Sequence, residues 1–98
     1  MAKDKEIKKI TFIVDGKKCI ISEPDFKQIS FGLSALSSTS GVDLAGGGKA
    51  IYDVCLIECD KEIKENGKML MSVCLKIAEE CLLPYEVEIK KIRKVLSY

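Results

Sequence analysis

The chain has 98 residues, of which 47% are hydrophobic and 32% charged, and its formal net charge is +1. This length and balance fit one globular domain with a modest core and exclude a disordered chain. No run approaches eighteen consecutive apolar residues, and the charged start, MAKDKEIKK, lacks a signal-peptide pattern. We therefore expect a single domain over residues 1–98, located in the cytoplasm and without a membrane span.

Residues 6–22 are predicted to form a β-hairpin. Asp15 and Gly16 provide the favoured two-residue turn, because both of its central positions require positive φ. An isolated two-stranded hairpin is only marginally stable in water, so the hairpin must pack on helices or join another strand. The cross-strand pairs expected on its apolar face are Phe12 with Cys19 and Ile10 with Ile21.

The region 23–83 is predicted to contain about three helices. The first begins at Ser22, where Asp25 stands three residues on, as in a capping box, and Pro24 is tolerated in the first turn. Phe31 points away from the core face of this helix. The side chains expected on that core face are Phe26, Ile29, Leu33 and Leu36.

The second helix is expected from about Lys49 to Cys59, and the preceding GVDLAGGGKA resembles a phosphate-binding loop. A Walker loop requires G-x-x-x-x-G-K-[ST], but Asp43 stands at the leading glycine and Ala50 at the hydroxyl position. The Rossmann pattern fails because Ile51 replaces the third glycine. We expect no nucleotide or other cofactor here, and we interpret the glycines as a mobile connection that lets the helix pack closely on a neighbour.

The third helix, KMLMSVCLKIAEECLL at residues 68–83, is the clearest element, and an acidic turn, DKEIKENG, precedes it. Its apolar arc covers about half of the circumference, which is broader than on an ordinary surface helix. We therefore expect this helix to be central to the fold or covered by a second molecule. The residues at helical spacing on its core face are Leu70, Val73, Cys74, Ile77 and Cys81.

Residues 84–98 carry two overlapping patterns. The segment YEVEIK, at 85–90, alternates as a half-buried strand does, and we favour a short third strand there, beside the hairpin, followed by a helical turn from Lys91. The predicted fold class is thus α+β, with the hairpin packed on the helices. The alternative helical face consists of Tyr85, Ile89, Ile92 and Leu96.

Five cysteines without a secretory signal indicate reduced thiols, and they raise the question of zinc. Structural zinc sites pair cysteines two to four residues apart, whereas Cys74 and Cys81 are separated by six residues and the chain has no histidine. Buried free cysteine behaves as a small hydrophobe. We therefore expect no metal site and assign the thiols to packing. The cysteines are Cys19, Cys55, Cys59, Cys74 and Cys81.

No catalytic residue is predicted. A cysteine nucleophile would need a base, and no histidine is present to serve. The cluster Glu58, Asp60, Glu62 and Glu65 is interspersed with lysines and lacks the EF-hand order, so it is interpreted as a solvated turn. No serine stands in G-x-S-x-G. We expect a protein that is not an enzyme and has no small-molecule substrate.

Residues 44–81 resemble small proteins from the tail-morphogenesis regions of phages and prophages, often described as tail assembly chaperone-like. The shared features are a small-residue start, a helix ending in an acidic turn (here ECDKEI), and a helix of the LMSVCLKIAEE kind. The resemblance implies that the chain keeps a long tape-measure protein soluble, in the cytoplasm of a bacterial host, while a tail tube assembles around it. The triple glycine and the cysteines depart from the family pattern.

A chaperone of a helical partner needs apolar surface that can receive an amphipathic helix. The candidates are apolar side chains that lie outside the predicted core face of each helix. Methionine suits a binding surface because its side chain is flexible and adapts to different partners. Core packing or self-association is the competing interpretation of each one. The candidate protein contacts are Phe31, Val54, Ile57, Met69 and Met71.

Two other functions stay open. The chain could be a homo-oligomeric structural tail or connector component that extends a sheet through the hairpin edge. It could instead be a small DNA-associated regulator, for which the lysines near its two ends are the support. Because these lysines alternate with acids or core residues, we expect a solvated face and no nucleic-acid partner.

Overall fold

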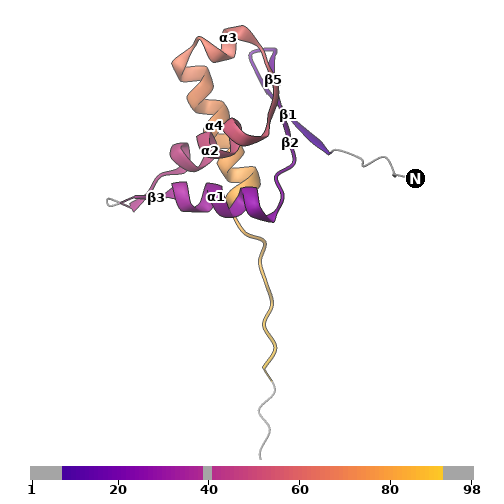
Figure 1. The fold of residues 1–98 in the computed structure, drawn as a ribbon, viewed down its shortest axis with the longest axis vertical. Coiled ribbons are helices and arrows are strands. Elements are labelled where there is room, and N and C mark those ends of the chain that lie inside the picture. Colours follow the sequence, from indigo (N-terminus) through magenta and orange to yellow (C-terminus); the bar gives the residue numbers. More distant parts are fainter. Residues whose placement is uncertain (1–7, 39–40, 92–98) are drawn as a thin grey trace, which may run out of the picture.

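The computed structural model describes residues 8–38 and 41–91 and has the predicted α+β fold, in which a small sheet lies beside packed helices (Figure 1). A separate pairing of β3 and β4 joins α1 to α2. The elements in chain order are β1 (Lys9–Val14), β2 (Lys17–Ser22), α1 (Phe26–Leu36), β3 (Ser37–Ser38), β4 (Gly41–Val42), α2 (Leu44–Cys55), β5 (Leu56–Cys59), α3 (Lys61–Lys64) and α4 (Gly67–Leu82).

The predicted hairpin is confirmed as β1 and β2, in the expected register. Asp15 and Gly16 have φ values of 50° and 75°, which are the positive values that the two-residue turn requires. Phe12 pairs with Cys19. Ile10 pairs with Ile21 in the same register, so the apolar face of the hairpin is the one that the sequence predicted.

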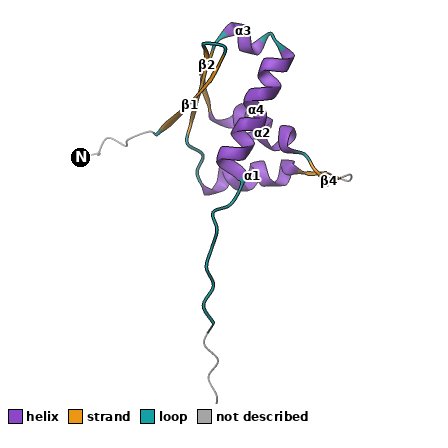
Figure 2. Ribbon diagram, turned by 180° about the vertical axis from the view of Figure 1, so that it is seen from behind, coloured by secondary structure: helices purple, strands orange, loops and turns teal. Residues whose placement is uncertain are grey.

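The third strand lies elsewhere than predicted. It is β5, which pairs antiparallel with β2 and gives the strand order β1-β2-β5. Asp60 fixes this edge, because the Lys18 N–H donates to its carboxylate (2.8 Å) and its own N–H donates to the Lys18 carbonyl (2.9 Å). The segment that was predicted to form this strand, 85–90, belongs instead to an arm, residues 83–91, that contains no strand or helix and runs away from the body (Figure 2).

The strand prediction for 85–90 was wrong because alternation describes a segment that could pair and does not specify a partner. The edge of β2 is taken by β5, which follows α2 directly in the chain. Pro84 also restricts the residue before it to extended backbone, which sends the chain away from the end of α4. The helical turn predicted from Lys91 falls mostly on residues 92–98, outside the described part of the chain.

Helix α1 begins three residues later than predicted, with Asp25 as its N-cap. The Asp25 carboxylate accepts from the Gln28 N–H (2.8 Å), and the Asp25 N–H donates to the Gln28 side chain (3.0 Å), which completes a capping box. Ser22 cannot start the helix because it ends β2. The expected capping box therefore exists, with Asp25 in its first position rather than its last.

The core face of α1 also differs from the prediction. Ile29 and Leu36 pack against the core, but Leu33 is exposed and Phe26 is 89% exposed. Gly32 is the buried residue of the helix, and a Cβ there would lie 2.9 Å from side-chain atoms of Ile51 and Leu82. Close contact at Gly32 brings α1 against Ile51 of α2, and Leu33, the next residue, points outward.

The three glycines lie inside α2 and form no mobile connection. The helix begins at Leu44, and the Asp43 carboxylate caps it by accepting from the Gly46 N–H (2.9 Å). A Cβ on Gly48 would overlap the backbone carbonyl of Cys74 in α4. The close packing expected of this segment is therefore confirmed. The C-terminal bound was wrong, since α2 ends at Cys55 and the residues after it form β5.

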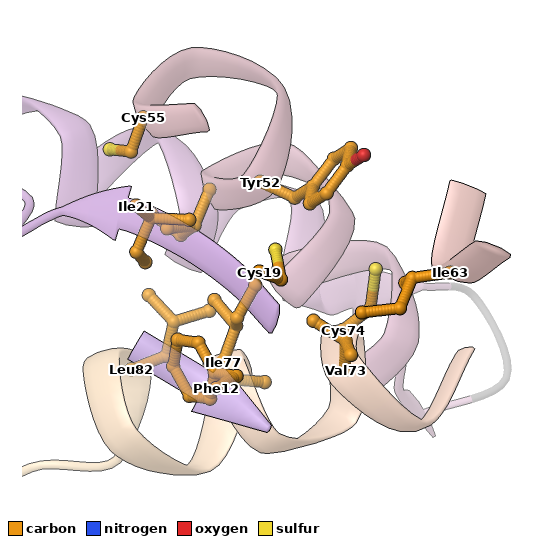
Figure 3. Packing of buried hydrophobic residues seen from close by; sticks show 12 residues of the cluster. Phe12, Cys19, Ile21, Tyr52, Cys55, Ile63, Val73, Cys74, Ile77 and Leu82 are labelled. Carbon is orange, nitrogen blue, oxygen red and sulfur yellow. The ribbon is translucent and has the colours of Figure 1, made fainter. Parts of the chain in front are cut away.

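Helix α4 is confirmed as the central element and covers nearly the predicted range. Its core side packs against α2, the hairpin and α3, and Figure 3 shows side chains from all four converging. The acidic turn before it contains the one-turn helix α3, whose Ile63 is fully buried. The largest fully buried side chains are Ile21, Ile51, Ile63, Ile77 and Cys19.

We predict that Gly48→Ala lowers the free energy of unfolding by about 3 kcal/mol or more, because the new methyl group meets a backbone carbonyl that cannot move without separating α2 from α4. Helix propensity alone would make the substitution favourable by about 1 kcal/mol. A decrease in the free energy of unfolding would therefore show that the packing contact outweighs helix propensity. Urea unfolding followed by circular dichroism measures it.

Gly67→Ala is the matched control, since Gly67 begins α4 and a Cβ there meets nothing within 4 Å. It should leave stability unchanged or slightly raised. Equal effects of the two substitutions would contradict the proposed backbone contact.

Candidate protein-binding surfaces

The buried thiols are held in their protonated, unreactive form. Desolvation by burial, reinforced by a hydrogen bond with Cys59, raises the pKa of Cys19 to about 12. Burial likewise raises the pKa of Cys81 to about 11 and that of Cys74 above its ordinary value. Because the thiolate is the nucleophile, these positions favour packing over chemistry.

The charged groups near the glycines and the acidic turn are engaged in structural contacts. Lys49 pairs with Asp53 (2.8 Å) and lies over the Tyr52 ring (5.7 Å to its centroid). Glu62 lies 3.7 Å from Lys17. Among the side chains that the structure describes, no polar or charged one is buried, and no group of three or more His, Cys, Asp or Glu residues is arranged to hold a metal ion.

Four of the five candidate contact residues are exposed. Phe31, Val54, Ile57 and Met71 have between 44% and 53% of their surface accessible, whereas Met69 is partly buried and packs against the core. The two methionines lie on different sides of α4. Met69 lines a hollow with Val14 and Asn66, while Met71 lines a crevice with residues of α2.

The candidates therefore do not form one continuous surface. Phe31 stands on α1, Val54 on α2 and Ile57 on the edge strand β5. Of the five, Met71 is the one beside an apolar depression that a side chain from another protein could fill.

That depression, which we call the α2–α4 crevice, has a volume of about 220 Å³. It lies between the first turns of the two helices, which approach closely because Gly48 has no side chain. Leu75 stands one turn beyond Met71 on α4 and is also exposed, so the apolar surface continues along the helix. The crevice is lined by Ala45, Lys49, Gly67, Leu70, Met71 and Cys74.

A larger groove, of about 530 Å³, was missed by the sequence analysis. It lies where the hairpin, α1, the end of α4 and the arm meet, and we call it the arm-root groove. Its apolar lining includes Ile10, Ile29, Leu33 and Leu82, and the acidic residues Glu23, Glu79 and Glu80 also line it. These residues come from segments far apart in the sequence, so no local pattern indicated them.

Comparisons of the chain with protein-family models, with curated proteins and with solved structures found no significant match. In the described part of the chain, no helix combines the length and the apolar character that a bilayer crossing requires.

We predict that stability falls as the pH rises from about 9 towards 12, because the unfolded chain releases its thiol protons before the folded chain does. Cys19→Ala should reduce this fall, by at most about 1.4 kcal/mol per pH unit. Urea unfolding in reducing buffer at several pH values measures the effect. Identical pH dependence of the wild type and the variant would contradict the raised pKa of Cys19.

Proposed function

We propose that this chain is a non-enzymatic protein-binding protein that covers an apolar face of a long helical partner. The observation that carries the proposal is the α2–α4 crevice, which continues into the exposed side chains of Met71 and Leu75. An amphipathic helix could place one apolar side chain in the crevice and lay the next turn against Leu75. The flexible methionine adapts to different side chains of such a partner.

The chemistry of the remaining groups supports binding over catalysis. The thiols of Cys19 and Cys81 are held protonated, and the chain contains no histidine to act as a base. The carboxylates of Asp43 and Asp60 accept backbone hydrogen bonds within the fold. These groups have structural roles that account for their positions.

The partner that we propose is the tape-measure protein of a phage or prophage tail, met in the cytoplasm of a bacterial host. The resemblance of residues 44–81 to tail assembly chaperone-like proteins supports this identity. That segment begins at α2 and reaches nearly to the end of α4, so it includes both helices that border the crevice. The crevice thus lies within the part of the chain on which the resemblance rests.

We predict that co-expression with the tape-measure protein encoded in the same gene neighbourhood raises the soluble fraction of that protein and yields a complex on affinity purification. The double variant Met71→Glu and Leu75→Glu should lose most of this effect, because it places carboxylates on the apolar surface. Both positions are exposed, so the fold should persist, as circular dichroism would verify.

Ile13→Glu is the matched control, since Ile13 is exposed on β1, away from the crevice, and should bind as the wild type does. No complex with any tail protein of the neighbourhood would contradict the proposed partner. Binding that is unaffected by the double variant would contradict the proposed surface.

A further inference from the structure

The arm, residues 83–91, exposes a row of apolar side chains to solvent. Tyr85, Val87 and Ile89 have between 73% and 94% of their surface accessible, and they alternate with charged residues. The radius of gyration is 18.2 Å, against about 13 Å for a compact chain of this length, which agrees with an arm that projects (Figure 1). A row of exposed apolar side chains indicates a contact surface.

The arm-root groove has the complementary character. Its lining is largely apolar, and its carboxylates make it acidic. Glu79 is paired with Lys76 at 3.0 Å, whereas Glu23 and Glu80 have no ion-pair partner among the described residues. An occupant that fits this groove combines apolar side chains with cations, and the end of the arm, VEIKK at 87–91, has Val87 and Ile89 on either side of Glu88, followed by two lysines.

We propose that two copies of this chain exchange arms, so that Val87 and Ile89 of one copy fill the arm-root groove of the other. Lys90 and Lys91 then lie near the unpaired carboxylates of Glu23 and Glu80. The exchange is reciprocal, because the same arm and the same groove are used by both copies, and such an interface closes as a two-fold dimer. It is independent of the tape-measure proposal.

The geometry favours the arm of a second copy over the chain's own arm. Leu83, Pro84 and Tyr85 already line the groove, so the chain would have to reverse direction immediately after Tyr85 to bring Val87 back. The segment after Pro84, YEVEIKK, contains none of the residues that dominate turns, which are glycine, proline, asparagine, aspartate and serine. The described chain instead runs outward from this point, as both ribbon views show.

Sedimentation of the full chain over a range of concentrations tests the exchange. We expect a reversible dimer, and we expect Val87→Glu with Ile89→Glu to give a folded monomer. Lys90→Glu with Lys91→Glu should raise the dimer Kd about tenfold or more, and adding Glu23→Lys with Glu80→Lys should restore it. Lys61→Glu with Lys68→Glu makes the same charge change on α3 and at the start of α4, away from the groove, and should leave the Kd unchanged.

A photo-crosslinker at Ile89 identifies the chain that is contacted. In a mixture of ¹⁵N-labelled and unlabelled protein, we expect crosslinks to Ile29 or Leu33 that join a labelled to an unlabelled chain. The exchange would be overturned by a monomer at every concentration. It would also be overturned by a dimer whose Kd is unchanged in the arm variants, or by crosslinks that form only within one chain.

Discussion

The contact between Gly48 and the Cys74 carbonyl is the constraint on which the rest of the fold depends. It brings the backbone of α2 against that of α4, while a Cβ on the neighbouring Gly47 would meet the side chains of Leu36 in α1 and Leu82 in α4. Three consecutive glycines are unfavourable in an isolated helix, by roughly 1 kcal/mol each relative to alanine. Helix α2 therefore exists because it is packed between α1 and α4.

The same close packing produces both candidate surfaces. Because α2 lies so near α4, residues from the first two turns of both helices together line the α2–α4 crevice. Because α1 meets α2 through Gly32, its bulky Leu33 turns outward and becomes part of the arm-root groove. Both surfaces thus border helices that meet through glycines.

What the sequence could predict was local. The Asp15-Gly16 turn determined the hairpin register, and helical spacing located α4, because neighbouring residues alone specify both. The third strand could not be found this way, since β5 depends on pairing with Cys19 and Ile20, about forty positions earlier. Met71 was a candidate contact for which core packing was the competing interpretation, and the structure shows it exposed. The crevice beside it depends on the contact at Gly48, which helix propensity argues against.

The two proposed interactions use opposite ends of α4. The α2–α4 crevice and the apolar surface beside it use α4 from Gly67 to Leu75, whereas the arm-root groove uses Glu79 to Leu82, about one turn further along. Arm exchange would therefore leave the crevice of each copy open. A dimer would offer two crevices to one partner, and a long helical protein with repeated apolar faces could occupy both. The second contact would then form at a high effective concentration, so weak individual crevices could hold such a partner firmly.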